Sequence, residues 1–314
     1  MAKYLLKRLL RSIVTVFIIV SVVFILMRQL PLDGFLPNVD KMSQEQIKNS
    51  LALLGLDQPI HVQLGRFWKQ LILEGDLGTS YVYRNNVPVL SVLATKIPLS
   101  IKIGSLAIML GLLLGLPLGN LMARYKNKFP DHVGTVFIVF IQAVPSAVYY
   151  LFIQLYGTDL FGLSLLFKES DWRSWILPVF SMALPNIIYY AMWIRRYTVD
   201  ESNKDYVQLA KIKGLSNKAI LYKHVFRNAF VPMVQYLPTS FLNTIVGSIY
   251  IESLYGIPGM GGLLIDVVKK QDNNMVQSIV MVFSVVGIVG LILGDLMMVL
   301  LDPRISFVAK EGSR

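Results

Sequence analysis

Residues 103–123 read IGSLAIMLGLLLGLPLGNLMA, a stretch of 21 residues without a charged side chain. A helix rises about 1.5 Å per residue, so roughly 20 such residues are enough to cross the hydrocarbon core of a bilayer. The stretch therefore predicts a transmembrane helix.

Similar stretches lie on both sides of it. They cover roughly Ser12–Met27, Val133–Gly157, Trp175–Ile194, Ala229–Ile251 and, with one interruption, Val276–Leu301. The first is short but long enough if Arg11 and Arg28 extend their side chains to the two membrane surfaces. The basic residues before it are typical of a signal peptide, but no small-residue cleavage site follows, so we interpret it as an uncleaved anchor. The sequence thus predicts six spans.

The composition of the whole chain agrees with a membrane protein. Of its 314 residues, 54% are hydrophobic and 16% charged, with a mean hydropathy of +0.57, whereas soluble domains have about 25% charged residues. The lack of Cys in the sequence excludes disulfides, thiol catalysis and Cys-ligated metals. His61, His132 and His224 are too far apart in the sequence to suggest a metal site. The net charge of +11 would suggest nucleic-acid binding in a soluble protein, but sorting of basic loops to one side of a membrane explains it here.

Lys and Arg are unevenly distributed between the two sides that six spans define. Residues 1–11, 124–132, 195–228 and the tail from 302 fall on one side and hold 18 of the 30 basic residues. The opposite segments are longer in total and hold only the other 12. Because basic loops stay in the cytoplasm, both termini are predicted to be cytoplasmic.

The external connection from about Pro31 to Pro98 is long and only moderately hydrophobic. Ser43 and Gln46 have the spacing of a capping box, which predicts the start of a helix. A second helix is predicted over Val62–Leu73, with an apolar face formed by Leu64, Phe67, Trp68, Leu71 and Ile72. The connection is either a packed surface subdomain or a vestibule that receives a partner or substrate.

Proline and glycine recur in and at the ends of the predicted spans. The prolines are Pro117, Pro145, Pro178, Pro185, Pro232 and Pro238, and the glycines are Gly111, Gly115, Gly119, Gly287, Gly290 and Gly294. Proline kinks a helix, and small residues allow helices to approach closely. The pattern indicates either a bundle that moves during transport or simply tight packing, and tight packing accounts for most of the glycines.

Asp295 is the candidate functional residue inside the membrane. It lies seven residues before Asp302, about 10 Å inside the end of the sixth span. It is expected either to face a polar cavity or to hydrogen-bond a neighbouring helix. No second buried carboxylate or histidine is expected that would complete a proton or sodium relay, which argues against an ion-coupled transporter.

Residues 205–232 read DYVQLAKIKGLSNKAILYKHVFRNAFVP and lie on the basic side between the fourth and fifth spans. Apolar residues at helical spacing predict a helix from about Asp200 to Lys213. Gly214 is suited to end this helix, and Ser216 to cap another that begins near Asn217. The loop is therefore predicted to be a helical hairpin.

Such a hairpin is either simply solvated or bound by a second protein. Solvation does not require apolar residues such as Leu209 on its outside. A partner with a matching groove does, since a short helix laid in a groove can transmit mechanical force.

At these residues the chain resembles the membrane subunits of binding-protein-dependent ABC importers, in their dipeptide and oligopeptide branch. The family's loop signature is Glu-Ala-Ala, three residues and Gly. Ala210 and Gly214 match it, while Gln208 and Leu209 replace the Glu and the first Ala. Residues 227–232, RNAFVP, are similar to the branch's downstream element.

Other motifs extend the resemblance over nearly the whole chain. They are LPLD at 30–33, GLDQP at 55–59, GDLGTS at 75–80, ESLYGIPGMG at 252–261 and LDPR at 301–304. The Gly-rich residues 256–262 are not a phosphate-binding loop, because no Lys-Ser/Thr follows them and they lie on the external side. They predict a turn and a short amphipathic helix that ends at Lys269-Lys270.

The resemblance implies an all-α membrane protein with six transmembrane helices, the type I ABC importer permease fold. Residues 1–93 would form an N-terminal anchor helix plus a partly helical external loop subdomain. Residues 94–304 would form the transmembrane domain, with a cytoplasmic coupling helix in a loop at about 200–228, and 305–314 a cytoplasmic tail. The chain would be a non-catalytic permease that binds no cofactor, metal or nucleic acid, while ATP and magnesium would bind to partner subunits.

The implied assembly lies in a bacterial or archaeal cell membrane. It contains membrane lipid, a second homologous permease, two cytoplasmic ABC ATPase subunits and an external substrate-binding protein. The expected ATPase-coupling residues are Tyr206, Gln208, Leu209, Ala210, Ile212, Gly214 and Leu215. Peptide is the expected substrate because it is the commonest in the branch, and nickel and oligosaccharides are the alternatives.

Two rival classes make different predictions. A self-contained secondary transporter or channel would work on an ion gradient without any ATPase. A membrane-embedded enzyme would need a nucleophile–base pair or metal ligands at one depth, and the sequence contains no HExxH or GxSxG motif.

Overall fold

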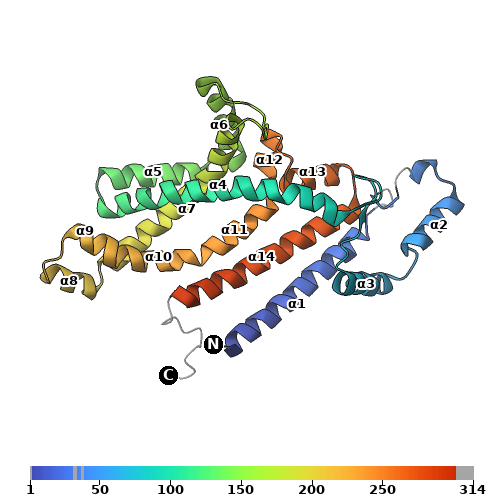
Figure 1. The fold of residues 1–314 in the computed structure, drawn as a ribbon, viewed down its shortest axis with the longest axis horizontal. Helices are drawn as coiled ribbons and strands as arrows, with labels where there is room; N and C mark the ends of the chain where they lie inside the picture. Colours follow the sequence, from blue (N-terminus) through green and yellow to red (C-terminus); the bar gives the residue numbers. More distant parts are fainter. Residues whose placement is uncertain (1, 31–33, 37–38, 302–314) are drawn as a thin grey trace.

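The computed structural model describes residues 2–30, 34–36 and 39–301, and these form a helical bundle (Figure 1). Its four longest helices are α1 (Ala2–Met27), α4 (Val89–Arg124), α7 (Arg173–Ser202) and α14 (Asn273–Leu301). Between α4 and α7 lie α5 (Phe129–Ala143) and α6 (Ser146–Phe161). Between α7 and α14 lie α8 (Asp205–Ile212), α9 (Asn217–Ala219), a π-helical segment (Ile220–Val225), α10 (Phe226–Val234), α11 (Tyr236–Val246), α12 (Ile249–Tyr255) and α13 (Met260–Lys269).

The predicted helical membrane fold is confirmed, and two of its spans are bent. The four longest helices have the length and composition to cross a membrane, and two bent helix pairs raise the number of candidate spans in the described residues to six. The predicted span at 133–157 is broken between α5 and α6, which meet at 106°. Val144 is extended there, with ψ of 131°, because it precedes Pro145, which has no N–H to continue the helix.

The predicted span at 229–251 is divided among α10, α11 and α12. Gly247 separates α11 from α12 with φ of 71°, a backbone conformation that favours glycine. The pair formed by α11–α12 and α13 is bent by 72°. The turn and short helix predicted after residue 256 are confirmed, since Gly256 ends α12 and α13 ends at Lys269.

α4 and α7 make the most extensive contact between helices, and glycines bring their backbones together. A Cβ added to Gly115 would lie 2.6 Å from the Ile187 carbonyl oxygen, and one added to Gly119 would clash with the Ala191 carbonyl. Gly294 in α14 is packed in the same way against the backbone of Gln235. Tight packing, one of the two interpretations of these glycines, is therefore confirmed at these positions.

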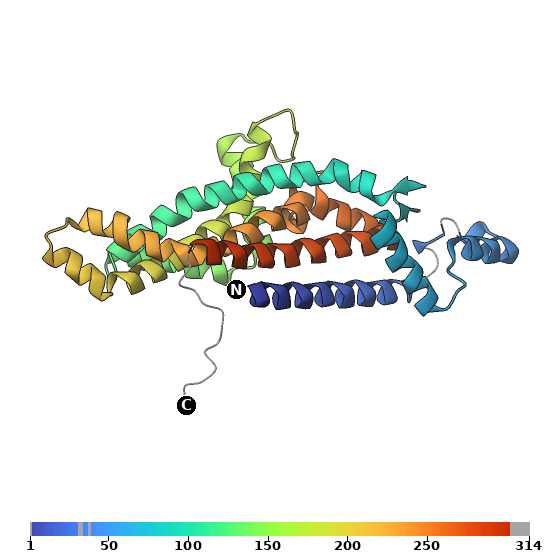
Figure 2. The same ribbon diagram turned by 60° about the horizontal axis from the view of Figure 1, so that its bottom comes forward.

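The first helix lies along the outside of the bundle, against α14 and α3 (Figure 2). α3 (Ile60–Lys69) contacts it through aromatic side chains. Trp68 stacks on Phe17 with ring centroids 4.8 Å apart, and its Nε1 donates a hydrogen bond of 3.1 Å to Ser21 Oγ. Phe67 lies 5.0 Å from Phe24 between centroids. The apolar face predicted for this segment thus packs on α1.

That face is shorter than predicted. The α-helix ends at Lys69 and a π-helical turn, Gln70–Glu74, follows it. A π turn has more residues per turn than an α-helix, so residues from the start of the turn onward are rotated away from the apolar face. Ile72, which the helical spacing places with Phe67 and Trp68, is 70% exposed, and this part of the prediction is wrong.

The rest of the connection between α1 and α4 contains short elements. They are a 3-10 turn (Val39–Lys41), α2 (Gln44–Leu54) and the two-residue strands β1 (Thr79–Ser80) and β2 (Val87–Pro88), which pair antiparallel. The predicted capping box is confirmed, with Gln46 N–H donating to Ser43 Oγ and Ser43 N–H donating to Gln46 Oε1. The motif LPLD falls largely at 31–33, and the tail from 302 and most of LDPR also lie outside the described residues.

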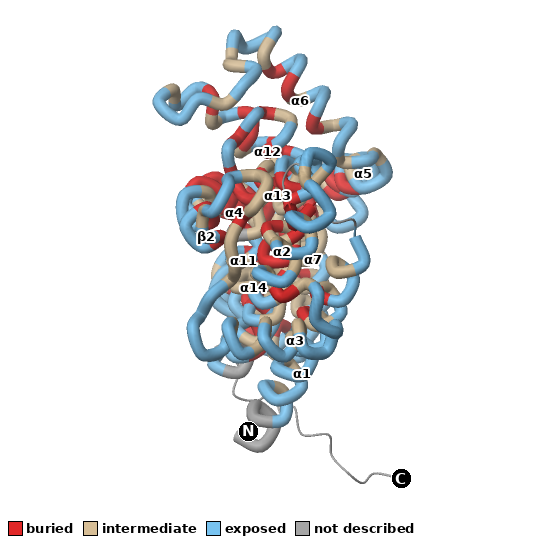
Figure 3. Tube along the Cα trace, turned by 90° about the vertical axis from the view of Figure 1, so that its right-hand side faces the viewer, coloured by how far each residue is buried: buried red, intermediate tan, exposed pale blue. Residues whose placement is uncertain are grey.

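The two ends of the bundle differ in character. Figure 1 shows α8 and α9 at one end, which we term the hairpin end, and α2, α3 and the strands at the other, the loop end. Buried residues concentrate between them, where α4, α7, α12 and α13 meet, while α1 and α2 are largely exposed (Figure 3).

We expect Gly115→Ala to destabilise the bundle, because its Cβ would force apart two backbones that have no flexible side chain to move. Overpacking of this kind costs about 1–3 kcal/mol. Gly287→Ala is the matched control, since no heavy atom lies within 4 Å of its added Cβ. Thermal unfolding in detergent should show a lower midpoint for Gly115→Ala than for Gly287→Ala, and equal midpoints would contradict the close α4–α7 contact.

Candidate functional site: the helical hairpin

The hairpin forms as predicted, with one change at its start. α7 continues to Ser202, the chain bends, and α8 begins at Asp205, so the single helix predicted from Asp200 is wrong. Gly214 ends α8 with φ of 77°, and its N–H donates to the Lys211 carbonyl at 2.9 Å. Ser216 caps α9 by accepting a hydrogen bond of 3.3 Å from Ala219 N–H.

One side of α8 is packed inside the hairpin. Val207 and Ala210 are 2% and 7% exposed and form a small core with Ile220 and Val225 from the returning segment. Tyr206 packs against the edge of this core. Of the predicted coupling residues, Tyr206 and Ala210 therefore hold the hairpin together, and their side chains are not on its outer surface.

The opposite side of α8 carries exposed apolar side chains. Leu209 is 52% exposed, Ile212 82% and Leu215 43%, and Gln208 beside them is also exposed. We term these four residues the outer face of the hairpin. The hairpin also carries four exposed lysines, Lys211, Lys213, Lys218 and Lys223.

Hydrogen bonds through Tyr206 tie the hairpin to the bundle. Its hydroxyl donates to Glu201 Oε2 at 2.7 Å, at the end of α7, and accepts from Asn228 Nδ2 at 3.2 Å, in α10. Burial, and then the bond to Glu201, raise the pKa of the Tyr206 hydroxyl above its usual range. The hydroxyl therefore remains a proton donor, and α8 moves with both α7 and α10.

A buried ion pair joins α5 to α7 near the same end. Asp131, which is 2% exposed, accepts hydrogen bonds from Arg195 Nε at 2.5 Å and Nη2 at 2.7 Å. Thr198 Oγ1 donates to Asn120 Oδ1 at 3.1 Å and links α7 to α4. Sequence reasoning missed these residues because they lie at or beyond the ends of the charge-free stretches. The only sequence feature that pointed to Asp131 was its position directly after Pro130, in the first turn of a helix.

Asp295 lies apart from the hairpin residues and bonds to neighbouring helices. It is 3% exposed on α14, accepts a hydrogen bond of 2.7 Å from Gln235 Nε2, and forms an ion pair with Arg8 of α1. Of the two roles considered for it, contact with a neighbouring helix is the one that the structure has.

Asp295 is one of four carboxylates that are buried among the described residues. Asp131, Glu252 and Asp272 are also at most 4% exposed. Each is satisfied locally: Glu252 accepts from Ser100 Oγ at 2.8 Å, and Asp272 from the N–H groups of Val82 and Tyr83. Asp131, Glu252 and Asp272 lie just beyond the ends of the charge-free stretches. Among the described residues, none of them forms a relay with Asp295.

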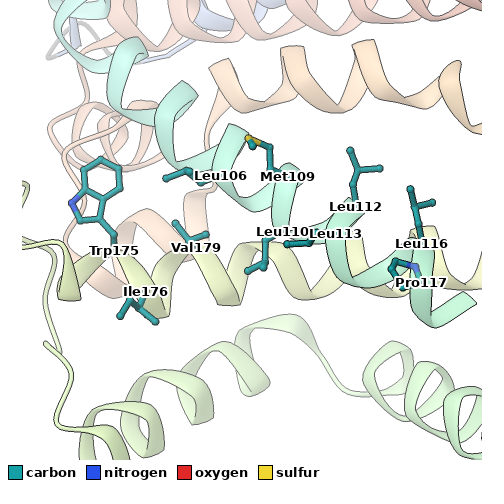
Figure 4. Close-up of a pocket in the computed structure, with 10 residues that line it drawn as sticks. All are labelled: Leu106, Met109, Leu110, Leu112, Leu113, Leu116, Pro117, Trp175, Ile176 and Val179. Carbon is teal, nitrogen blue, oxygen red and sulfur yellow. The ribbon is translucent and has the colours of Figure 1, made fainter.

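A broad apolar groove of about 810 Å³ lies between α4 and α7 (Figure 4). It is lined by Leu106, Met109, Leu110, Leu112, Leu113, Leu116, Pro117, Trp175, Ile176 and Val179. Several of these side chains are strongly exposed, including Met109 at 65% and Leu113 at 69%. Within residues 2–30, 34–36 and 39–301, no three His, Asp or Glu side chains gather as a metal site.

A membrane-spanning helical bundle that presents an apolar, Lys-rich hairpin at one end has the architecture of a type I ABC importer permease. Comparison with known proteins gives the same class. Residues 115–307 match the family model described as "Binding-protein-dependent transport system inner membrane component", and residues 1–104 match the model of its N-terminal region. The chain belongs to this family of multi-pass inner-membrane permeases, whose members are not enzymes.

Individual relatives are transport permeases. The chain is 37% identical over 214 residues to the oligopeptide transport system permease protein AmiC of Streptococcus pneumoniae, covering 67% of this chain but 42% of AmiC. It is 30% identical to the dipeptide transport system permease protein DppB of Lactococcus lactis, over 97% of this chain and 99% of DppB. It is 32% identical to the glutathione transport system permease protein GsiC of Salmonella choleraesuis, over 98% and 100% of the two chains.

We expect Tyr206→Phe to loosen the hairpin without unfolding the bundle. The change removes a hydrogen bond to a carboxylate, and because Tyr206 is only half-buried we expect a loss of about 1 kcal/mol, the value of a typical hydrogen bond. Amide hydrogen exchange of α8 should accelerate several-fold in this variant. Tyr222→Phe is the control, because Tyr222 is 63% exposed, and equal exchange in the two variants would contradict the role given to Tyr206.

The pair of Arg8 and Asp295 predicts an asymmetric response to mutation. Arg8→Met leaves a carboxylate with a 4% exposed side chain, and losing one partner of a buried pair costs roughly 3–5 kcal/mol. Asp295→Asn keeps the hydrogen bond to Gln235. The Arg8 side chain is 30% exposed and close enough to the helix end to reach water, so we expect the free energy of unfolding to fall by only about 1 kcal/mol. Thermal unfolding should rank Arg8→Met below Asp295→Asn, with the double variant recovering part of the loss. The reverse ranking would show that the arginine is the group that needs its partner.

Proposed function

We propose that the chain forms one half of the translocation pathway of an ATP-driven importer, and that its hairpin is the element on which cytoplasmic ATPase subunits act. The observation that carries this proposal is the outer face of the hairpin. Leu209 and Ile212 are exposed although Val207 and Ala210 on the opposite side of the same short helix are buried, and Leu215, just after the helix, is exposed as well. Exposed apolar residues on a rigid helix fit a groove on a second protein.

The charge distribution supports a cytoplasmic position for this end. The segments on the side of the hairpin carry 18 of the 30 Lys and Arg residues. By the positive-inside rule, both termini and the hairpin then face the cytoplasm, and the loop end faces outward. ATP and magnesium bind to the ATPase subunits in this arrangement and not to this chain.

The contacts of the hairpin provide a route for force. A push on the outer face reaches α7 and α10 through Tyr206, Glu201 and Asn228, and reaches the returning segment through the core around Val207. α7 is packed on α4 along its length, so the two move as a unit. When two ATPase subunits close on the hairpins of the two permeases, the two helical bundles would rotate to an outward-facing state. ATP hydrolysis would let the bundles return to the inward-facing state, because each of the two states has its own contacts.

The pathway needs a second, homologous permease. The groove between α4 and α7 offers that subunit an apolar seat in the bilayer, with Met109 and Leu113 exposed along it. An external binding protein would deliver substrate at the loop end. Proposed domain limits follow the same division, with residues 1–93 as the anchor helix and external subdomain and 94–304 as the transmembrane domain.

Peptide is the proposed substrate. The relatives named above are permeases for oligopeptides, dipeptides and glutathione, and two of them align along almost their whole length. Nickel or oligosaccharide transport by the same machinery is the alternative. Uptake by cells that carry or lack the gene, measured with labelled dipeptides, nickel and oligosaccharides, distinguishes these substrates.

Gly214→Val should uncouple ATP hydrolysis from transport. Gly214 has φ of 77° and no heavy atom within 4 Å of an added Cβ, so the substitution acts through backbone strain, of order 1–3 kcal/mol, and redirects the second helix. In membrane vesicles that contain the assembly, we expect uptake to fall at least tenfold while ATPase activity persists.

Gly75→Val is the matched control, because Gly75 has φ of 64° and equally open surroundings but lies at the loop end. Normal uptake in Gly214→Val, at normal expression, would contradict the coupling role. Crosslinking from a Cys placed at Leu209 should trap an ATPase subunit, and transport by an ion gradient without any ATPase would point to a secondary transporter instead.

A further inference from the structure

The loop end contains a polar cavity that the proposed transport mechanism does not use. It has a volume of about 260 Å³ and lies between the end of α1, the end of α2, α3, the loop before β1 and the start of α14. Pockets for drug-sized ligands measure roughly 300–1,000 Å³, so this cavity suits a smaller molecule. Its chemistry is set by a buried guanidinium group and by buried amide oxygens.

Arg28 is the central residue of this cavity. Its guanidinium lies between two aromatic rings, 4.6 Å from the centroid of Phe24 and 4.7 Å from that of Phe35. Its Nε and Nη1 atoms are buried and make no hydrogen bond to the described residues. The rings stabilise the charge through their faces, but they do not accept the hydrogen bonds of its edge.

This environment is costly for a cation. Burial lowers the pKa of Arg28 to about 10, with the nearby Tyr81 hydroxyl only partly opposing that effect. A buried charge without a hydrogen-bonded counter-ion is among the least favourable groups in a protein. An anion in contact with Arg28 would remove most of this cost.

Two glutamine side chains bring acceptors to the same cavity. Gln277 is 2% exposed, and its Oε1 is buried and has no hydrogen-bond partner among the described residues. Gln63 donates through Nε2 to the carbonyls of Leu56 and Gln58, at 3.2 and 2.7 Å, which fixes its amide and leaves its buried Oε1 without a partner there. These oxygens call for N–H donors on a ligand.

The cavity is lined by two further charged residues, one basic and one acidic. Arg66 also lines it and lies against Gly55, which adds a second guanidinium. Asp76 lines it too, but its Oδ1 already accepts a hydrogen bond of 2.8 Å from Gly78 N–H. With two guanidinium groups and one carboxylate, the charged side chains that line the cavity have a net positive charge, which favours an anion over a free metal cation.

We propose that this cavity binds a small carboxylate that also carries N–H donors, either an amino acid or the C-terminal end of a short peptide. Its carboxylate contacts Arg28, and its N–H groups donate to Gln63 and Gln277. The proposed function is needed only to identify a peptide, and not a free amino acid, as the source of this carboxylate. The carboxylate site rests on the buried donors and acceptors of the cavity.

Binding to the full-length chain in lipid nanodiscs tests the proposal by calorimetry. The probes are glycine, the dipeptide Ala-Leu, its C-terminal amide, and acetate. We expect Ala-Leu to bind at least tenfold more tightly than the amide, which is about 1.4 kcal/mol. Glycine binding as tightly as Ala-Leu would identify a free amino acid as the ligand, and weaker glycine binding would identify the peptide end.

Variants locate the site. Arg28→Met should lower the affinity for Ala-Leu at least tenfold. Gln277→Glu should also lower the affinity for Ala-Leu at least tenfold while preserving the fold, because it places a carboxylate of the chain itself in the cavity. Arg84→Met is the control, since Arg84 is exposed at the same end and does not line the cavity. Thermal unfolding of each variant separates loss of binding from loss of fold.

Several outcomes would overturn the proposal. These are equal affinities for the dipeptide and its amide, affinity that is unchanged in Arg28→Met and Gln277→Glu, or binding of none of the probes. Binding that appears only after Asp33→Asn would assign the carboxylate of the chain itself to Arg28 and exclude a ligand. If glycine binds through Arg28 but cells take up no peptide, the result supports the ligand site in the cavity and contradicts peptide as the transported substrate.

Discussion

The contact between α4 and α7 is the constraint on which the other contacts of the bundle depend. Gly115 and Gly119 allow the backbone of α4 to touch that of α7, so these two helices have no room to slide or rotate separately. In lipid the hydrophobic effect does not drive helices together, so close packing and a few polar contacts must do so. Every other span is attached to this pair or to a helix that contacts it.

The polar contacts are concentrated where the spans end. Asp131 holds α5 to α7 through Arg195, Glu252 joins α12 to α4 through Ser100, and Asp272 holds the loop before β2 to the start of α14. A carboxylate is costly to bury, but at these positions each carboxylate accepts hydrogen bonds from several N–H or O–H groups that the ends of helices and turns leave unpaired. The middle of the bundle can therefore be apolar while its ends are fixed in register.

Sequence reasoning predicted the spans and the hairpin because both depend on local patterns. A charge-free run of sufficient length, as at 103–123, has few alternatives to a membrane helix, and Gly214 with Ser216 marks a helix end and a helix start. The 106° bend after Val144 was foreseen only as a proline kink. The angle depends on what α6 packs against, which no local pattern encodes.

The same limit explains which features of the candidate site the sequence did not indicate. Helical spacing placed Tyr206 and Ala210 together with Leu209, and only the returning segment, with Ile220 and Val225, decides which side of α8 is covered. Likewise, Asp131 and Arg195 are 64 residues apart in the chain, and nothing local to either one indicates the other. Patterns within one helix predict that a face exists, whereas pairing across the fold determines its use.

The two ends of the molecule differ in whether buried polar atoms lack hydrogen-bond partners among the described residues. At the hairpin end, backbone and side-chain hydrogen bonds are made and apolar side chains such as Ile212 are left uncovered, which is the condition of a surface that a folded protein covers. The loop end also exposes apolar side chains, such as Leu53 and Ile72, but there the buried polar atoms of Arg28 and Gln277 in addition lack hydrogen bonds to the described residues. Apolar surface is satisfied by any complementary shape, but a buried guanidinium and an amide oxygen require a ligand with an acceptor and donors at fixed positions. The proposals of a small-ligand site at the loop end and of a docking surface at the hairpin end rest on this difference.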